Sequence, residues 1–294
     1  MKVGFIGLGN MGLPMAKNLV NAGYEVYGKN RSRGKEELFE QAGGKTGLSL
    51  AEMAQELDVI LTCLPLPEDV ENVYFDDEGL IAHAREGLII VDHSTVAPEL
   101  NRTVAQAVEK KGAAYLDAPI SGGNFGAEDG TLTIMTGGKK EVYEQVLPLF
   151  EVMGENIYHI GDVGSGSVVK LLNNLMVSFH TQAVSEAVAL GKKMNVDTDL
   201  LFNILNASYA QSRIYERHYN NFIAKDDFTA GFAIKLLHKD MKLAEQMADR
   251  AEMDLPIGKQ LTSRLKAAMD DGLSEEDMSA LYVLMQRENA NIVK

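Results

Sequence analysis

The pattern of apolar and polar residues changes about halfway along the chain. Up to residue 162, short runs rich in β-branched residues alternate with stretches of helical periodicity. The expected strands are 3–6, 24–29, 58–64, 88–92, 114–117, 131–136 and 157–160, and helices such as 11–22, 98–111 and 140–153 lie between them. Strands that alternate with helices predict a parallel, doubly wound sheet with helices on both faces.

The second half is predicted to be entirely helical. From Gly164 on, the strand signals end, and helices are expected at 165–193, 198–207, 213–224, 232–252, 256–271 and 276–287. The first of these would be ~43 Å long at 1.5 Å per residue. We therefore expect two domains, 1–162 and 163–294, joined by this long central helix. Because such a helix often supplies a subunit interface, a homo-oligomer (dimer or tetramer) is expected.

Composition narrows the choice of partners. The formal net charge of −14 disfavours binding to nucleic acid, since an acidic surface repels phosphate. Cys63, the single cysteine, lies in an apolar run and is interpreted as a buried strand residue. The first strand begins at once, without a signal peptide, and no apolar run reaches the roughly 18 residues of a membrane span. These features predict a cytoplasmic protein with a small-molecule ligand.

The segment Gly7–Gly12 has the spacing G-x-G-x-x-G directly after an expected strand. Gly7 would allow a tight turn, Gly9 would let a pyrophosphate approach the backbone, and Gly12 would let helix and strand pack closely. The amides and positive end of the following helix would hold the phosphates. A lone G-x-G-x-x-G also occurs in ordinary turns, but this context favours a dinucleotide site. The predicted contacts are Gly7, Leu8, Gly9, Asn10, Met11 and Gly12.

The end of the second expected strand indicates which dinucleotide binds. A cofactor without a 2′-phosphate usually meets a carboxylate there, which accepts both ribose hydroxyls. Asn30 fills that place instead, and Arg31, Ser32 and Arg33 follow it. Arginine and serine can bind a 2′-phosphate, although a solvated basic loop is the alternative. We predict NADP, with NAD less favoured. The expected contacts are Asn30, Arg31 and Ser32, together with Leu64 and Pro65 at the end of the third strand.

Two loops at strand ends carry candidate chemistry. The segment 92–98 lies at the edge where open α/β sheets bind ligands. There Thr95 could contact the nicotinamide, although Ser94 or Thr95 could equally cap the helix that starts at Pro98. In the segment 117–123, Ser121, Gly122 and Gly123 could present successive backbone N–H groups to a carboxylate, and a plain turn is the alternative.

Two helical segments add charged residues. Lys170 and Asn174 are four residues apart on the long helix and therefore share a face. A lysine in an otherwise apolar helix beside a nucleotide domain is a candidate proton donor, and a surface lysine is the alternative. In the segment 232–244, Lys239 could reach the cofactor ribose and Asp240 could orient a pocket group. No His, Cys or carboxylate cluster has metal spacing, so no catalytic metal is predicted.

These segments occur together, in this order, in one family. The chain resembles the β-hydroxyacid dehydrogenases, which include 3-hydroxyisobutyrate dehydrogenase, tartronate semialdehyde reductase and the glyoxylate/succinic semialdehyde reductases. The resemblance covers essentially the whole chain and rests on segments 4–12, 92–98, 117–132, 164–174 and 239–240. It implies an N-terminal Rossmann domain and an all-helical C-terminal domain for substrate binding and oligomerisation.

The resemblance also implies roles for single residues. Lys170 would be the catalytic acid–base, and Thr95 and Lys239 would contact the cofactor. The substrate carboxylate would bind at Ser121, Gly122, Gly123 and Asn174, with Asp240 close to the site. Two segments depart from the family. Asn30-Arg31 replaces the acid of the NAD-preferring members, and 208–213 is bulkier than the usual loop, which leaves the distal part of the substrate open.

The predicted function is hydride transfer between NADP(H) and a small β-hydroxyacid or semialdehyde of the glyoxylate, succinic semialdehyde or tartronate semialdehyde type. Lys170 would protonate the developing alkoxide. The main alternative is an NAD-dependent 3-hydroxyisobutyrate dehydrogenase. Decarboxylation of a sugar phosphate normally comes with a larger helical domain, and imine-reducing relatives lack the lysine. A non-catalytic NADP-binding scaffold would have lost Lys170 or the Ser-Gly-Gly turn, and both are intact.

A pair of arginines suggests a site for the distal end of the substrate. Arg213 and Arg217 are four residues apart on an expected helix and can project from one face. They could bind a second anionic group of a dianionic substrate. Alternatively, both arginines are solvated or pair with Glu216 or acids elsewhere.

Overall fold

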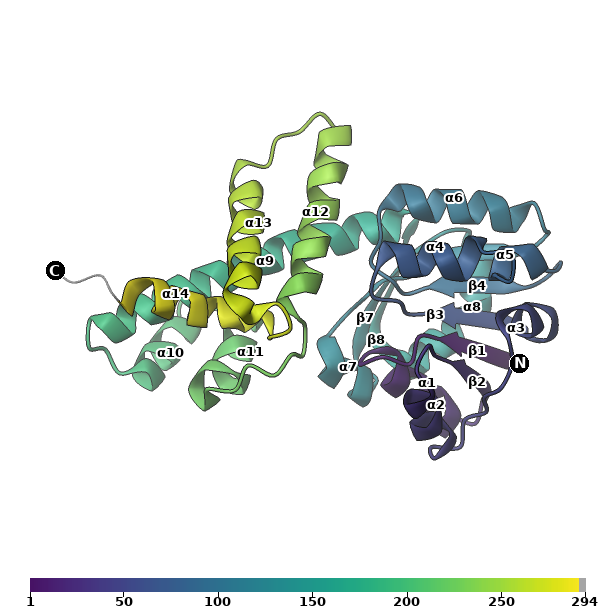
Figure 1. Cartoon of the computed structure of the whole chain (residues 1–294), viewed down its shortest axis with the longest axis horizontal. Coiled ribbons are helices and arrows are strands. Elements are labelled where there is room, and N and C mark those ends of the chain that lie inside the picture. The colour runs from purple at the N-terminus through teal and green to yellow at the C-terminus, as the bar shows by residue number, and fades with distance from the viewer. Residues whose placement is uncertain (291–294) are drawn as a thin grey trace. The chain divides into compact units, whose positions relative to one another are not determined.

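The computed structural model describes residues 1–290 and divides into two compact units, Met1–Lys170 and Leu171–Lys294 (Figure 1). The last four residues of the expected second domain, 291–294, lie outside the described residues. The sequence places the domain boundary between 162 and 163, whereas the first compact unit also includes the start of the long helix. No helix within residues 1–290 is long and apolar enough to cross a membrane.

The first unit is built on a sheet of eight strands within residues 1–170. They are β1 (Lys2–Ile6), β2 (Glu25–Lys29), β3 (Val59–Thr62), β4 (Ile89–Asp92), β5 (Ala114–Asp117), β6 (Ile120–Ser121), β7 (Leu132–Gly137) and β8 (Gly154–Gly161). The order is β2-β1-β3-β4-β5-β7-β6, and β8 pairs with β7. In the register of β4 and β5, Asp92 stands opposite Asp117, so both strands end level at one edge of the sheet.

The sheet is mixed, whereas the strand–helix alternation predicts a parallel one. Strands β1 to β5 are parallel to one another, and β7 is parallel to β8. However, β7 is antiparallel to β5 and β6. Only residues 122–131 connect β6 to β7, and a parallel crossover needs roughly a dozen residues or more. β6 itself escaped prediction because two residues carry no periodicity.

Helices cover both faces of the sheet, so the unit is doubly wound as predicted. They are α1 (Gly12–Asn21), α2 (Arg33–Glu40), α3 (Leu50–Glu56), α4 (Pro67–Phe75), α5 (Leu80–His83), α6 (Pro98–Glu109), α7 (Gly123–Asp129) and α8 (Lys140–Met153). Neighbouring residues of each strand point to opposite faces. Leu61 packs in the core with α1 and α8, whereas Ile60 packs in a second core with α4 and α6.

In the second unit, residues 171–290 form helices joined by loops, without a strand, and the long helix begins in the first unit. The helices are α9 (Ser165–Lys193), α10 (Thr198–Asn206), α11 (Arg213–Asn221), α12 (Ile234–Arg250), α13 (Pro256–Ala268) and α14 (Leu281–Ala290). Single-turn segments lie at η1 (Ile223–Lys225), η2 (Met269–Leu273) and η3 (Met278–Ala280). The predicted bounds of α9 are confirmed. Leu237, Met241, Leu261 and Leu281 form part of the helical core.

Candidate active site

The glycine-rich loop between β1 and α1 is shaped by close backbone contacts. A Cβ atom at Gly12 would lie 1.9 Å from the carbonyl oxygen of Gly7, so only glycine allows helix and loop to pack here. Gly7 has a φ of 96°, and a Cβ there would lie 2.3 Å from the carbonyl oxygen of Cys63. At Gly9, by contrast, an added Cβ would meet no atom within 4 Å. The backbone at Gly9 is therefore open to a ligand, which fits the pyrophosphate of a dinucleotide.

The N-terminus of α1 also suits an anion. No acidic side chain lies in its first turn, and its N-cap residue, Met11, offers no side-chain acceptor. The Leu13 amide donates to the Gly9 carbonyl oxygen over 3.1 Å, and the N-terminus of α1 offers a phosphate the positive end of the helix dipole. The Leu8 amide donates to Oδ1 of Asn30 over 2.9 Å.

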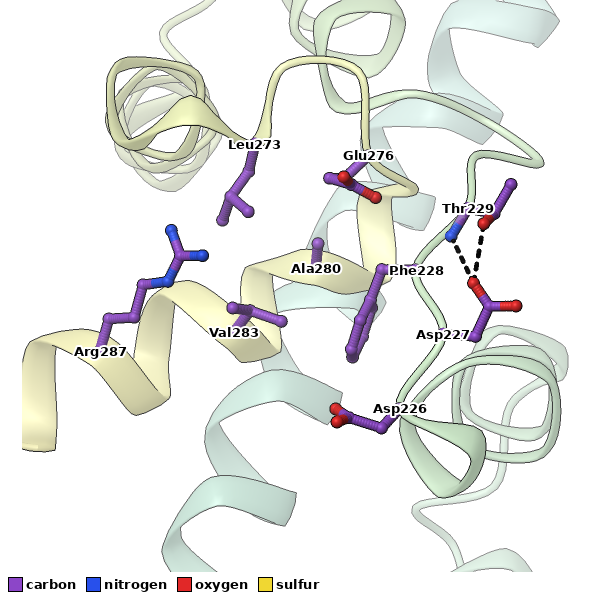
Figure 2. Close-up of a pocket in the computed structure, with 9 residues that line it drawn as sticks. All are labelled: Asp226, Asp227, Phe228, Thr229, Leu273, Glu276, Ala280, Val283 and Arg287. Carbon is purple, nitrogen blue, oxygen red and sulfur yellow. Dashed lines mark hydrogen bonds between the residues drawn. The ribbon is translucent and has the colours of Figure 1, made fainter.

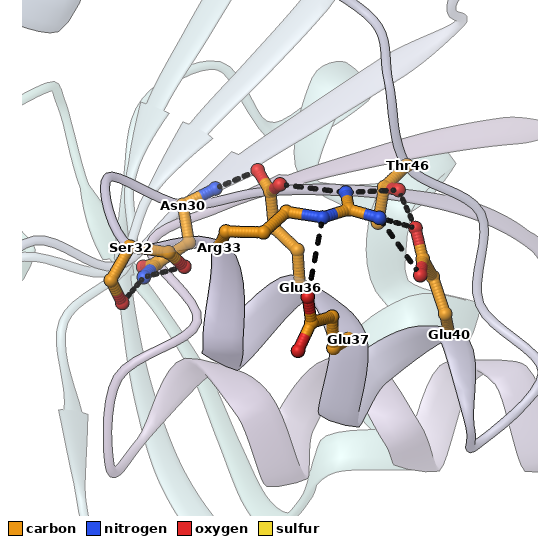
Figure 3. A network of polar contacts seen from close by, with 7 residues as sticks. All are labelled: Asn30, Ser32, Arg33, Glu36, Glu37, Glu40 and Thr46. Carbon is orange, nitrogen blue, oxygen red and sulfur yellow. Dashed lines mark hydrogen bonds and ion pairs between the residues drawn. The ribbon is translucent and has the colours of Figure 1, made fainter.

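Asn30 ties the glycine-rich loop to the end of β2. Its Oδ1 accepts from the Leu8 amide, and its Nδ2 donates to Oγ of Ser32 over 2.9 Å. Figure 3 shows the contact with Ser32. The Asn30 backbone N–H donates to Oε1 of Glu36 over 2.9 Å. Asn30 therefore connects the glycine-rich loop, Ser32 and Glu36 through hydrogen bonds.

Glu36 is a carboxylate near the end of β2 that the sequence analysis missed. Its side chain is only 13% exposed and pairs with Arg33 over 3.2 Å. Figure 3 shows Arg33 surrounded by three acids, Glu36, Glu37 and Glu40. The signal in the sequence was a glutamate in the first turn of the helix after β2. Arg33 is consequently engaged by these acids, whereas the more exposed Arg31 has only a 3.6 Å contact to Asp69 among the ion pairs of the described residues.

A buried polar chain fixes the loops that follow β3 and β4. Oδ1 of Asp92 accepts from the Thr62 hydroxyl over 2.8 Å and from the Ser94 amide over 2.9 Å. The Ser94 hydroxyl in turn accepts from the Leu64 amide over 2.9 Å. These bonds fasten the segments that carry Leu64 and Thr95 to each other. Ser94 and Thr95 do not cap α6, because its N-cap residue is Ala97.

The Ser121–Gly123 segment turns sharply at the end of β6. Gly122 and Gly123 have φ values of 139° and 64°, which a residue with a Cβ atom rarely adopts. Gly122 precedes α7 without a side-chain cap. This geometry is compatible both with a carboxylate-binding turn and with a plain turn.

Lys170 is the last residue of the first compact unit, and it lies one turn past the start of α9. Its side chain is buried, with 8% of the residue exposed. Lys170 is therefore not an extended surface lysine, the alternative considered from the sequence. Asn174 follows one turn later on the same helix face.

In the second unit, three of the expected site residues form a connected group. Nδ2 of Asn174 on α9 donates to Oδ2 of Asp240 on α12 over 2.6 Å. Nζ of Lys239 lies 3.0 Å from Oδ1 of the same carboxylate. Asp240 is 2% exposed, so its charge is removed from water and balanced by Lys239. The Asp240 carboxylate thereby orients the Asn174 amide and holds the Lys239 ammonium group.

The two arginines of α11 have different surroundings. Arg217 makes a two-pronged ion pair with Asp277, with Nη1–Oδ1 at 2.9 Å and Nη2–Oδ2 at 2.6 Å. Asp277 is fully buried, so this ion pair belongs to the helical core. Arg217 therefore pairs with an acid elsewhere in the chain, which was the alternative to a role in substrate binding. The guanidinium lowers the pKa of Asp277 despite the opposing effect of burial. Arg213 is exposed.

An open pocket of about 430 Å³ in the second unit is lined by none of the expected site residues (Figure 2). Its lining has three carboxylates, those of Asp226, Asp227 and Glu276, against one guanidinium, that of Arg287, and is therefore net acidic. Asp227 accepts hydrogen bonds from the amide and the hydroxyl of Thr229, as Figure 2 shows. This acidic lining would repel an anionic substrate. This pocket is therefore not the candidate binding site for an anionic substrate.

A doubly wound sheet with an open glycine loop after β1 is the architecture of dinucleotide-binding proteins. Residues 2–161 match the family model described as the NAD binding domain of 6-phosphogluconate dehydrogenase. Residues 164–285 match the model described as NAD-binding of NADP-dependent 3-hydroxyisobutyrate dehydrogenase. The chain belongs to the β-hydroxyacid dehydrogenase (3-hydroxyisobutyrate dehydrogenase) family, which confirms the predicted resemblance. It is a nucleotide-dependent enzyme that acts on a CH–OH group.

Named relatives cover nearly the whole chain. The 2-(hydroxymethyl)glutarate dehydrogenase of Eubacterium barkeri is 37% identical, over 98% of this chain and 95% of the relative. The 2-hydroxy-3-oxopropionate reductase of Escherichia coli is 37% identical, over 97% of each chain. Among solved structures, Mycobacterium tuberculosis 3-hydroxyisobutyrate dehydrogenase with L-serine has a TM-score of 0.87 at 30% identity, over 97% of this chain and 99% of that chain.

Proposed function

We propose that this enzyme transfers hydride between NADP(H) and a small β-hydroxyacid or its semialdehyde, with glyoxylate, succinic semialdehyde and tartronate semialdehyde as the leading substrates. The name of the Escherichia coli relative supports this choice, because 2-hydroxy-3-oxopropionate is tartronate semialdehyde. The substrate of the Eubacterium barkeri relative is a dicarboxylate, which supports testing longer substrates with a distal charge.

The observation that carries this proposal is the position of Lys170. It is buried, and it belongs to the same compact unit as the open glycine loop. The bound nicotinamide would supply or accept the hydride. In the direction of reduction, the Lys170 ammonium group would donate a proton to the carbonyl oxygen as negative charge develops there. In the direction of oxidation, the neutral amine would take the proton from the hydroxyl group.

The remaining residues would bind and orient the reactants. We assign the substrate carboxylate to the backbone of Ser121, Gly122 and Gly123 and to the amide of Asn174. Asp240 would keep that amide in place through its 2.6 Å hydrogen bond, and Lys239 would contact the cofactor. The phosphates and ribose would be held at 7–12, 30–32, 64–65 and Thr95. Residues 1–162 would thus form the cofactor domain and residues 163–294 the substrate and oligomerisation domain.

The NADP preference rests on charge at the end of β2. The side chain of Arg31 is 92% exposed, and Glu36 is occupied by the Asn30 amide and by Arg33. An exposed guanidinium can bind a 2′-phosphate. Glu36 also favours the second candidate, NAD-dependent oxidation of 3-hydroxyisobutyrate, because its carboxylate lies near the place where ribose hydroxyls would bind.

Steady-state kinetics with both cofactors test the proposal. The assay uses a panel of C2–C5 aldehyde-acids and hydroxyacids, including 3-hydroxyisobutyrate and L-serine. We expect kcat/KM to be at least about tenfold higher with NADPH, or ~1.4 kcal/mol, which is reasonable for one charge-assisted contact. Arg31→Ala should remove this advantage and leave the NADH values unchanged. Equal or better kcat/KM with NADH would overturn the NADP assignment, and absence of turnover across the panel would overturn the substrate class.

A homo-oligomer is also proposed, with its contact on the outer helices of the second unit. Leu190 on α9 and Met194 just after it are 64% and 68% exposed. On α10, Leu200 and Ile204 are 55% and 53% exposed, and no side chain of this helix is fully buried. A patch of exposed apolar side chains usually marks a contact surface. A second copy of the chain is the occupant that we propose.

A further inference from the structure

A buried carboxylate from the sheet holds the start of α9. Asp117 is the last residue of β5 and is 1% exposed. Its Oδ1 accepts from the Gly164 amide over 2.6 Å, and its Oδ2 accepts from the Ser167 amide over 2.9 Å. Amides at the beginning of a helix have no partner within the helix. Asp117 therefore provides for α9 a cap that comes from a different element, at the positive end of the helix dipole.

A second contact fastens the same helical turn from the side. The Ser167 hydroxyl accepts from Nδ2 of Asn101 on α6 over 2.7 Å, and the Tyr115 hydroxyl donates to Oδ1 of Asn101 over 2.7 Å. Asn101 is 1% exposed and Ser167 is fully buried. Ser167 is thus held both through its main chain, by Asp117, and through its side chain, by Asn101. These two contacts, from different sides, fix the rotation of this turn about the helix axis and its position along the axis.

The backbone is tightly packed around this turn of α9. A Cβ atom at Gly166 would lie 2.2 Å from the carbonyl oxygen of Met135 and 2.9 Å from Oδ2 of Asp117. A Cβ atom at Gly137 on β7 would lie 2.5 Å from Oδ1 of Asp117. Close packing of this kind resists displacement.

Burial raises the pKa of Asp117 and the charge of Asp92 adds to this, whereas the two amides oppose the shift.

We infer that Asp117 is a positioning residue for Lys170, with Asn101 as a second anchor; this inference rests on the proposed role of Lys170 as proton donor. Lys170 lies three residues after Ser167 and therefore on the same side of α9, one turn further on. The bonds that fix Ser167 also set the direction in which the Lys170 side chain leaves the helix. Proton transfer depends steeply on this direction, since a misplacement of about 1 Å can cost about 100-fold in rate.

A double-mutant cycle between positions 117 and 170 tests the inference. Asp117→Asn keeps the shape of the side chain, but the amide nitrogen cannot accept the second N–H group. We expect kcat to fall by roughly 10- to 100-fold and the Kd for NADPH to change by less than about threefold. In the Lys170→Ala background, Asp117→Asn should change kcat by less than about twofold, because the group that it positions is gone. The deuterium isotope effect with 4-deuterated NADPH should also rise in Asp117→Asn, which a smaller fraction of folded enzyme would not cause.

The outcomes separate this inference from the proposed function. If Lys170→Ala alone keeps a near-normal kcat, the proposed role of Lys170 fails. If Lys170→Ala is impaired but Asp117→Asn has the same effect in both backgrounds, or none, Asp117 does not act through Lys170. If Asp117→Asn does not fold, Ser167→Ala replaces it in the cycle, because this change removes only the Asn101 anchor. The expected loss of kcat is then a few-fold, and it should again vanish in the Lys170→Ala background. Asp197→Asn is the matched control: Asp197 caps α10 through the Leu200 amide and should affect stability without changing kcat.

Discussion

The two ends of α9 are held in opposite ways. Its first turn is bound by directional contacts from β5 and α6, through Asp117 and Asn101, and it is buried. Its last turn carries two exposed lysines and the exposed Leu190, and Gly191 there packs closely against Leu201 of α10. One helix therefore combines an end that is fixed by hydrogen bonds with an end that exposes apolar side chains.

This difference follows from what each end has to do. Hydrogen bonds depend on angle, so buried polar contacts specify the rotation of a helix and the direction of a side chain such as Lys170. Apolar contacts depend mainly on area and tolerate small adjustments. They suit an interface between subunits, where the total buried surface matters more than the angle of any one group. The proposed catalytic and assembly roles of α9 lie at the ends whose contacts suit them.

The largest expected effect compares lysines at the two ends. Lys170→Ala should lower kcat by roughly 10²–10⁴, the usual contribution of a positioned acid–base group, while the Kd for NADPH stays nearly unchanged. Lys192→Ala, at the exposed end of the same helix, should leave both values as they are. The measurements are steady-state kinetics and titration of NADPH fluorescence. A near-normal kcat in Lys170→Ala would show that the proton comes from elsewhere, for example from water or Asp240.

Acidification should weaken both units through one buried histidine in each. Burial lowers the pKa of His93 to about 4, against the effect of its bond to the Ala118 carbonyl oxygen. Burial and the charge of Arg217 lower the pKa of His218 to about 3, and the ring of His218 lies 3.1 Å from the hydroxyl of Thr181 on α9. Both stay neutral in the folded state, whereas an unfolded histidine takes up a proton below about pH 6.5.

The unfolded state therefore binds more protons between about pH 6.5 and 4, and the free energy of unfolding should fall as the pH falls through this window. The expected loss is about 3 kcal/mol for each histidine. Denaturant unfolding across the window measures the slope, which His93→Asn and His218→Asn should each reduce. His83→Gln, at a partly exposed position, should not change it. Equal slopes in all four proteins would contradict this prediction.

A charge at the apolar end of α9 should separate subunits without affecting catalysis directly. Leu190→Asp would place a carboxylate among side chains that we expect to be buried by a second copy, and desolvation of that charge is costly. The dissociation constant of the oligomer should rise by roughly 100-fold, or ~2.7 kcal/mol, by sedimentation analysis. Leu38→Asp, at an exposed position of the first unit, is the matched control. A wild-type protein that is monomeric at all concentrations would refute the proposed contact.

The smallest expected effect concerns the distal end of the substrate. Arg213 is exposed, whereas Arg217 is committed to Asp277. Arg213→Ala should therefore lower kcat/KM for succinic semialdehyde about three- to tenfold more than for glyoxylate, which has no distal charge; one surface ionic contact is worth about 1 kcal/mol. A proportional loss for both substrates, or no loss for either, would show that Arg213 has no part in selectivity.

Much of the fold could be predicted because its signals are local. The bounds of α9 follow from uninterrupted helical periodicity between Gly164 and Lys193. The presence of the other helices of the second unit follows in the same way, although the last one begins at Leu281 and not at the expected residue 276. The glycine-rich loop is equally local, since the strand, the turn and the helix all lie within residues 2–21. In both cases, the spacing of side chains along the chain already encodes the backbone geometry.

The sequence by itself thus determined the doubly wound architecture, the helical second unit and the family, and it supplied the predicted site residues without Glu36. Only the tertiary structure decided the contacts between distant segments. Asp117 meets Gly164 and Ser167 across 47 and 50 residues, Arg217 meets Asp277 across 60, and β7 turns antiparallel to β5. No periodicity records such pairings, because a carboxylate or a guanidinium in the sequence fits many partners. Which partner it takes is decided when the strands and helices pack and the remaining buried polar groups must satisfy one another.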